Sequence, residues 1–247
     1  MTQFFGYNDF HISLMPSPAG MISFLDHEVN SWQGLQILDT ACGSGQLAQE
    51  MIARGANVTA LECDPTVLAQ AIEISRRQRK ARSPYFLRGS PDDMPGEAAS
   101  FQMILCLSNA VAALTSAESF QAFFARTALL LTPNGRLVLQ LFNYDRILHM
   151  QDFTLEDISL PEEGILVQRH FQLRSDGMLD LVSNIRILRM DAYEVSTHHS
   201  HIYPITSDEI RFMLSESGFI KTNFYADVQS VEWQADSYST IIIAVHH

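Results

Sequence analysis

Positive charge is scarce in this sequence. It has 16 lysine and arginine residues against 28 aspartate and glutamate residues, which gives a net charge of −12. Proteins that bind nucleic acid without sequence preference need many cations, because they displace counterions from the phosphates. The basic cluster at residues 76–82 lies at the end of an expected helix, where cations interact favourably with the helix dipole. The composition therefore argues against nucleic acid and favours a small-molecule partner.

Cysteine is also rare, and long apolar runs are missing. The three cysteines, Cys42, Cys63 and Cys106, form no C-x-x-C pair, so we expect neither a disulfide framework nor a cysteine metal site. Each lies at or just after the end of an expected strand, where packing is favoured over a nucleophilic role. No apolar run is long enough to span a bilayer, and residues 1–10 lack the basic start and apolar middle of a signal peptide. We expect a cytoplasmic protein that does not bind membranes.

What the sequence does contain is an alternation of strand and helix patterns over most of its 247 residues. This length suits one α/β domain, residues 1–247. Residues 1–33 are expected to form a segment that caps the ligand crevice, with a helix at 17–31, and simple packing against the domain is the equal alternative. Apolar runs predict strands at 35–40, 58–62, 85–88, 101–107 and 136–142. Helical periodicity predicts helices at about 45–54, 65–80 and 116–131.

The pattern changes over residues 151–203. Apolar and polar residues alternate there with a period of two, which predicts short antiparallel strands. Ser175-Asp176-Gly177 is a hairpin turn signal within this stretch. The α/β pattern returns with a capping box, Thr206 to Glu209, at the start of a helix. Strands at 219–226 and 238–246 complete the chain.

The clearest site pattern follows the first expected strand, in the stretch Asp39-Thr40-Ala41-Cys42-Gly43-Ser44-Gly45. Glycines let the backbone turn sharply and approach a ligand. Asp39 ends the strand, where its charge would repel a pyrophosphate and attract a cationic amino group. Glu62 ends the second strand, 23 positions later (62 − 39), where a carboxylate can accept both hydroxyls of a ribose. Asp64 competes for this role, but the strand's period favours Glu62.

The D-x-A-C-G-x-G pattern resembles motif I of the class I S-adenosylmethionine (SAM)-dependent methyltransferases. Residues 89–91 stand where that family usually has Gly-Asp-Ala, and residues 132–136 resemble its Pro-Gly-Gly turn. The resemblance implies a Rossmann-like sheet of seven strands in the order 3-2-1-4-5-7-6, with helices on both faces and the last strand antiparallel. It also implies SAM as cofactor, held by Asp39, Ala41, Gly43, Gly45, Glu62, Cys63, Ser90, Pro91 and Leu107. Ser90 departs from the family's acid, and Pro91 has no N–H to donate to an adenine.

Two further stretches, residues 106–110 and 143–148, are similar to those of glycine and sarcosine N-methyltransferases. Those enzymes also carry an antiparallel insertion after strand 5, so residues 151–203 are expected to cover the active site. The similarity implies that Leu107 and Asn109 lie near the methionine part of SAM and the acceptor. Tyr144 is a candidate acceptor contact, with packing as the equal alternative. The family's substrate-binding arginine is Phe142 here, so glycine is not the expected acceptor.

We therefore expect a SAM-dependent methyltransferase that acts on a small molecule, with an amine preferred, by direct in-line displacement. Asn109 and Tyr144 would position the acceptor, and no metal is expected. A non-catalytic SAM- or nucleoside-binding regulatory module is the alternative, because Ser90 replaces the adenine acid. A nicotinamide dehydrogenase is disfavoured by Asp39 and the missing third glycine. His198, His199 and His201 favour a solvated strand over a metal or base site, although His201 or Tyr203 could face the crevice from the insertion. No pattern indicates an oligomeric state.

Overall fold

A computed structural model describes residues 19–78, 82–150, 152–162, 164–189 and 192–247. The main sheet has seven strands: β1 (Gln36–Asp39), β2 (Asn57–Glu62), β3 (Tyr85–Arg88), β4 (Phe101–Cys106), β5 (Leu131–Phe142), β11 (Phe219–Tyr225) and β12 (Ser239–His246). The second sheet has five: β6 (Asp152–Thr154), β7 (Ile158–Leu160), β8 (Ile165–Leu173), β9 (Leu179–Arg189) and β10 (Ala192–Ile202). The helices are α2 (Ala19–Asp26), α3 (Gln46–Ala53), α4 (Pro65–Arg77), the 3-10 helix η2 (Ala110–Ala113), α5 (Ala117–Leu130), α6 (Tyr144–Met150) and α7 (Ser207–Glu216). In the described ranges no helix is both long and apolar enough to cross a bilayer.

The strand order of the main sheet is β11-β12-β5-β4-β1-β2-β3, which confirms the predicted order. Strands β1 to β5 run parallel, and β12 runs antiparallel to both β5 and β11. The carboxyl ends of β1 to β5 therefore meet at one edge of the sheet, the edge where open α/β sheets bind ligands.

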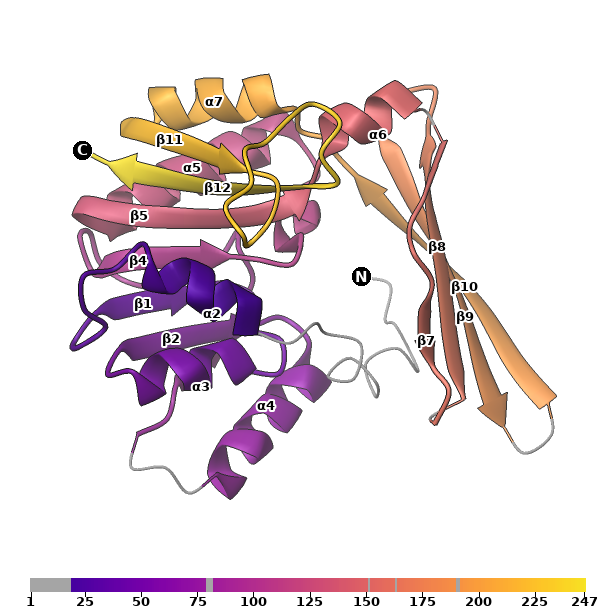
Figure 1. The fold of residues 1–247 in the computed structure, drawn as a ribbon, viewed down its shortest axis with the longest axis horizontal. Coiled ribbons are helices and arrows are strands. Elements are labelled where there is room, and N and C mark those ends of the chain that lie inside the picture. The colour runs from indigo at the N-terminus through magenta and orange to yellow at the C-terminus, as the bar shows by residue number, and fades with distance from the viewer. Residues whose placement is uncertain (1–18, 79–81, 151, 163, 190–191) are drawn as a thin grey trace.

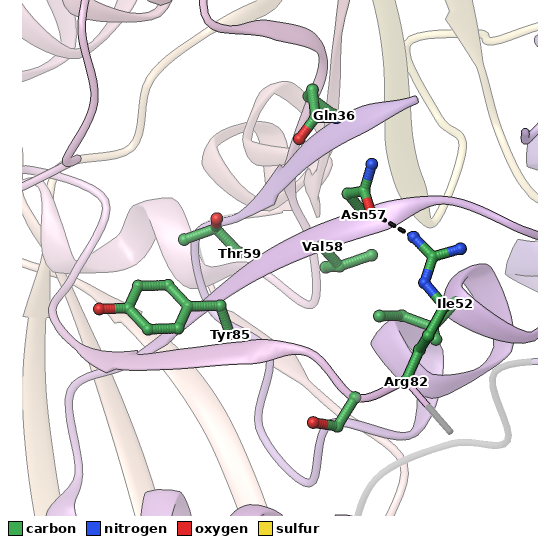
Figure 2. Close-up of a pocket in the computed structure, with 8 residues that line it drawn as sticks. Gln36, Ile52, Asn57, Val58, Thr59, Arg82 and Tyr85 are labelled. Atoms are coloured by element: carbon green, nitrogen blue, oxygen red, sulfur yellow. Dashed lines mark hydrogen bonds between the residues drawn. The ribbon is translucent and has the colours of Figure 1, made fainter. Parts of the chain in front are cut away.

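The opposite edge carries a hollow of its own, which Figure 2 shows. Its volume is about 290 Å³, and it is bordered by the amino ends of β1, β2 and β3 through Gln36, Asn57, Thr59 and Tyr85. The Arg82 guanidinium closes one side and donates a hydrogen bond to the Asn57 side-chain oxygen. This hollow lies at the edge away from the glycine turn, so it is not the candidate site.

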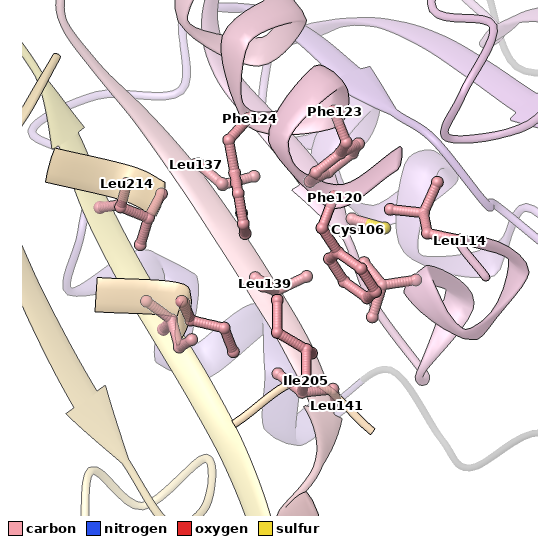
Figure 3. Packing of buried hydrophobic residues seen from close by; sticks show 14 of the residues in the cluster. Cys106, Leu114, Phe120, Phe123, Phe124, Leu137, Leu139, Leu141, Ile205 and Leu214 are labelled. Carbon is pink, nitrogen blue, oxygen red and sulfur yellow. The ribbon is translucent and has the colours of Figure 1, made fainter. Parts of the chain in front are cut away.

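Side chains alternate between two cores, one on each face of the main sheet. Ile104, Leu139 and Ile242 face the core built with α5 and α7, where Phe120, Phe123 and Phe124 are buried (Figure 3). Their sequence neighbours Met103, Leu105, Val138, Ile241 and Ile243 face the core built with α2 and α3. The period of two explains why the central strands read as continuous apolar runs: both faces are buried.

The second sheet stands beyond the carboxyl ends of β1, β4 and β5 (Figure 1). It touches the main domain through Phe171 of β8. The Phe171 ring packs edge-on against Phe142 at the end of β5, with centroids 5.4 Å apart, and against Tyr144 at the start of α6, at 6.3 Å. The insertion predicted at 151–203 is therefore an antiparallel sheet on the ligand-binding side. That it covers an active site stays a prediction.

The first helix differs from its expected range. The helix predicted at 17–31 ends at Asp26, and its expected start at residues 17–18 lies outside the described residues. Weak helix formers follow at Asn30 and Ser31. The Trp32 indole N–H donates to the Asp26 carboxylate at 2.7 Å and fixes the turn. The described part, α2, packs into the core on the α3 side of the sheet.

The start of β5 also differs. The predicted strand begins at residue 136 after a turn at 133–135, whereas β5 begins at Leu131. The turn is absorbed as an irregularity inside the strand: the register between β4 and β5 shifts there, and Asn134 adopts a left-handed φ of 62°. Asparagine tolerates this conformation better than most residues, which is why the strand continues through it.

Candidate active site at the carboxyl edge of the sheet

The turn between β1 and α3 is built on two left-handed glycines. Gly43 has φ 52° and Gly45 has φ 72°, a region that side chains other than glycine rarely adopt. A Cβ at Gly45 would also lie 3.0 Å from the Phe86 ring of β3. The backbone of residues 41–45 therefore curls tightly over the carboxyl ends of β1 and β2, as the glycine pattern predicts.

Asp39 lies buried under this turn, with 2% of its surface exposed. Its carboxylate accepts a hydrogen bond from the Ala41 backbone N–H at 3.3 Å. Burial raises the pKa of Asp39 from 3.8 to about 7, a rise that the Ala41 bond reduces and that the nearby Glu62 charge increases. A buried carboxyl group with a raised pKa suits a cationic partner, because a nearby positive charge would stabilise its ionised form.

Glu62 occupies the end of β2 and is also buried, with 8% of its surface exposed. Its two oxygens accept one backbone N–H each, from Gly43 at 3.1 Å and from Asp64 at 2.9 Å. The carboxylate is thereby tied to the glycine turn and held in one orientation. The Asp64 carboxylate instead caps α4 by accepting the backbone N–H groups of Thr66 and Val67 at 2.8 and 3.0 Å. This arrangement supports Glu62 over Asp64 as the candidate ribose ligand.

The three cysteines stand close to this edge but differ in exposure. Cys42 and Cys106 are buried, and Cys63 is exposed. Burial raises the pKa of Cys63 to about 11 and that of Cys106 to about 12, with neighbouring carboxylates adding to both, and it raises the pKa of Cys42 as well. Thiols with raised pKa values are poor nucleophiles at neutral pH, as expected for packing residues. Cys63 lies exposed beside Glu62 and is a candidate wall for an adenine.

The loop after β3 contains Ser90 and Pro91. The Gly89 backbone N–H donates to the Glu62 carbonyl at 3.2 Å, which brings this loop next to the end of β2. The Ser90 hydroxyl donates to the exposed Asp92 carboxylate. An acid is therefore present beside the position where the resemblance lacks one, which makes Asp92 a candidate for the missing adenine contact.

Asn109 follows β4 in a strained backbone segment. Ser108 and Asn109 both have positive φ, 54° and 62°, and the Asn109 backbone N–H donates to Gln140 of β5 at 3.0 Å. Strain of this kind persists only where the surroundings fix it, and it is common at functional sites. Leu107, just before this segment, is buried.

The Asn109 side chain is held from β5 and α6. Its Oδ1 accepts the Phe142 backbone N–H at 3.2 Å and the Tyr144 hydroxyl at 2.9 Å. Tyr144 is 1% exposed, and burial raises its pKa above the usual range. The structure thus places Tyr144 as a buried support for Asn109. The Asn109 Nδ2, by contrast, donates to none of the residues that the structure describes.

Asn143 is a residue whose role the sequence did not indicate. It is buried, and its Nδ2 donates to the backbone carbonyls of Gln234, Ala235 and Ser237 at 3.3, 3.0 and 2.9 Å. These bonds anchor the loop between β11 and β12 to the end of β5. They also hold Tyr238 beside Phe142, with ring centroids 6.4 Å apart. A side chain that bonds carbonyls about 90 positions away leaves no local signal in a sequence.

The histidines of β10 do not gather into a site. His199 and His201 share one face, as their spacing predicts, and both are exposed on the side away from Phe171. His198 faces the opposite way. Tyr203 donates to Glu209 at 2.6 Å and stacks near Phe120, so it belongs to the core of α5 and α7. Among the described residues no group of three histidine, cysteine or acidic side chains is placed to hold a metal.

Comparisons with known proteins agree with this geometry. Residues 37–135 match the model of a family described as a methyltransferase domain. The glycine/sarcosine N-methyltransferase of Halorhodospira halochloris is 24% identical over 224 residues, which cover 86% of this chain and 76% of the relative.

Solved structures share the fold at low identity. A SAM-dependent methyltransferase from Clostridium acetobutylicum superposes with a TM-score of 0.75 at 14% identity, and the alignment covers 99% of this chain and 98% of the other. The SAM-bound amino pentose methyltransferase CalS10 from Micromonospora echinaspora superposes with a TM-score of 0.68 at 16% identity, over 96% and 95% of the two chains. The family match contains the glycine turn, β2 and β4, which carry most of the candidate site.

Proposed function

We propose that this chain, which is a class I SAM-dependent methyltransferase, transfers a methyl group to the neutral amine of a small molecule. One observation carries the proposal. Two buried carboxylates, Asp39 and Glu62, lie on either side of a glycine turn, at the edge of the sheet where ligands bind. One carboxylate fits an ammonium group and the other fits a ribose, and SAM contains both.

The residues present fit SAM. Asp39, with its raised pKa and a single backbone hydrogen bond, would accept the amino group of the methionine part. Glu62, held by the Gly43 and Asp64 backbone N–H groups, would accept the ribose hydroxyls with its remaining lone pairs. Ser90 and Asp92 would face the adenine. When bound, SAM supplies a methyl group on a cationic sulfur, which is already activated for displacement.

The protein's contribution is then to orient the acceptor and exclude water. Asn109 is fixed by Phe142 and Tyr144, and its Nδ2 is left to donate to the acceptor. The rings of Phe142, Phe171 and Tyr238 form an apolar cluster beside it. Such surroundings favour the neutral form of an amine, which is the nucleophilic form.

The ionisable groups bonded to Asn109 in the described part of the chain support an amine over a hydroxyl as acceptor. Among the described residues, the ionisable side chain that contacts Asn109 is Tyr144, whose buried hydroxyl is already donated to Asn109. An alcohol would need a base to remove its proton at neutral pH, whereas a neutral amine already has a free lone pair. The relative from H. halochloris and CalS10 are named for methylation of amino compounds, which supports the same choice.

A matched acceptor panel tests this proposal. Each amine is paired with the alcohol of the same skeleton, and formation of S-adenosylhomocysteine is measured with wild type, Asp39→Ala and the exposed control Asp208→Asn. We expect turnover with amines only, its loss in Asp39→Ala and its retention in the control. Equal turnover of the paired alcohols would overturn the choice of an amine, and normal turnover by Asp39→Ala would overturn the assigned SAM site.

A further inference from the structure

Arg169 lies on the face of the second sheet that meets the main domain. Residues 165, 167, 169 and 171 of β8 point to one side, because side chains alternate along a strand. Phe171, two residues from Arg169, is the residue that packs against Phe142 and Tyr144. Two residues of strand span about 7 Å. Arg169 is therefore about one small molecule's length from the aromatic rings that surround Asn109.

The side chain of Arg169 has no polar partner among the described residues. It forms none of the ion pairs or side-chain hydrogen bonds among the described residues, and its Nε is buried with no acceptor. Arg169 as a residue is partly exposed, but its Nε is shielded from water, and a shielded donor without an acceptor costs free energy until a partner satisfies it. The chain has 28 acidic residues and only 16 basic ones, so an arginine that pairs with none of the described acids and has a shielded Nε is consistent with an anion supplied by another molecule.

The neighbours of Arg169 across the sheet are polar. The strand register places Ser183 of β9 opposite Arg169, and His198 of β10 opposite Ser183. The rows on either side of this polar row contain Val167 and Ile185 in one direction and Phe171 in the other, all buried. A short polar row that carries one cation between apolar rows is the form of a specific binding site, where few polar groups fix a ligand's orientation.

We propose that Arg169 binds an anionic group of the methyl acceptor, either a carboxylate or a phosphate ester. The proposal rests on the proposed function, because the anion is placed on the molecule that is methylated. A guanidinium presents a planar set of donors that matches carboxylate and phosphate oxygens. The two charged parts of the site are then separate: Asp39 and Glu62 hold the cationic cofactor, and Arg169 on the opposite wall holds the anionic end of the acceptor.

The chain offers a matched control for this arginine. Arg186 lies on the neighbouring strand β9, opposite Leu166 in the register, and its side chain is exposed on the other face of the sheet. Arg169→Met and Arg186→Met therefore remove the same charge from the two faces of one sheet. Arg169→Lys keeps the charge at the inner face but loses the planar donor set.

The first experiment measures anion binding without turnover. Acetate and inorganic phosphate are titrated separately into the SAM-loaded protein, and the rise in unfolding temperature is recorded at constant ionic strength. We expect saturable stabilisation of wild type and Arg186→Met by at least one anion, a weaker effect in Arg169→Lys, and none in Arg169→Met. Equal stabilisation of Arg169→Met and wild type, or no saturable effect in wild type, would overturn the proposal.

The second experiment uses pairs of amines that differ only in an anionic group, such as an amino acid and its amide, or an amino sugar and its phosphate. Loss of one charge-assisted hydrogen bond corresponds to about tenfold to hundredfold in affinity. We expect Arg169→Met to raise KM for the anionic member about that much with kcat little changed, and Arg186→Met to match wild type. Preference for the uncharged member by wild type would contradict the proposal. Calorimetry with SAM distinguishes failure of the anion site from failure of the proposed function. Arg169→Met should bind SAM like wild type, whereas failure of SAM to bind wild type would refute the proposed function itself.

Discussion

Replacing the buried carboxyl group of Asp39 by an amide should stabilise the ligand-free protein and abolish its function. In Asp39→Asn the side chain keeps its shape and can still accept the Ala41 backbone N–H, which is 3.3 Å from the carboxylate. It can no longer ionise. The variant therefore removes the energetic cost of a buried negative charge, together with its repulsion of Glu62.

The magnitude follows from the raised pKa of Asp39, which is about 7 in the folded protein against 3.8 ordinarily. Because the pKa is higher in the folded protein than in the unfolded chain, the stabilisation from protonated Asp39 is fully present below pH 4. It is lost as the pH rises through 7, where the folded protein must hold the buried negative charge. A difference of about three pKa units corresponds to at most about 4 kcal/mol. Between pH 5 and pH 8 the advantage of the variant over wild type should grow by about 2.5 kcal/mol.

The assay is urea unfolding of both proteins without SAM, followed by far-UV circular dichroism at pH 5, 6, 7 and 8. Taking the difference between the two proteins at each pH cancels the contributions of titrating groups that do not interact with Asp39. Asp208→Asn, at an exposed position in α7, is the control and should differ from wild type by the same amount at every pH. A difference between Asp39→Asn and wild type that does not change with pH, or that falls as the pH rises, would refute the reasoning.

Three further substitutions test the supports of the site. Gly45→Ala should destabilise the protein by about 1–2 kcal/mol in urea unfolding, because φ is 72° and the new Cβ would lie 3.0 Å from Phe86; an unchanged midpoint would contradict this. Tyr144→Phe should cost about 1 kcal/mol of stability and lower kcat, since it removes the 2.9 Å hydrogen bond to Asn109. Unchanged turnover would contradict the proposed role of Asn109 in positioning the acceptor. Asn143→Ala should cost about 2–3 kcal/mol and speed amide exchange in the loop before β12, because three carbonyls lose their donor; unaltered exchange in that loop would argue against the anchoring role.

The order of the main sheet was predictable because its evidence is local. Asp39 and Glu62 end β1 and β2, Gly89 and Asn143 directly follow β3 and β5, and the apolar runs of β1 and β4 match strands buried on both faces. Gly43 and Gly45 predict the turn. The resemblance of this stretch to motif I places the turn directly after the first strand of the sheet. Glu62 could be preferred to Asp64 from the strand's period alone, and the cap that Asp64 forms on α4 agrees with that choice.

The parts that were not predictable depend on contacts between distant segments. The spacing of the β10 histidines shows which of them share a face, but only the packed structure shows which face meets the main domain. Tyr144 follows an asparagine at a strand end, which fits an exposed contact or a buried support equally well. Whether the face of β8 that carries Arg169 meets the main domain depends on how the second sheet docks through Phe171, and no pattern within β8 encodes that docking.

The central claim is that Asp39 and Glu62 bind SAM, and calorimetric titration of SAM at pH 6 and pH 7.5 tests it most directly. With a pKa of about 7, Asp39 is mostly protonated at pH 6 and must release its proton to pair with the amino group of SAM. The ionised fraction of Asp39 rises about eightfold from pH 6 to pH 7.5, and partial deprotonation of the amino group of SAM at pH 7.5 reduces the predicted gain in affinity to about fivefold. We also predict release of close to one proton at pH 6, read from the dependence of the heat on buffer ionisation. Asp39→Asn should bind weakly and without this proton release. Equal affinity at both pH values with no proton release, or unaltered binding by Asp39→Asn, would contradict the claim.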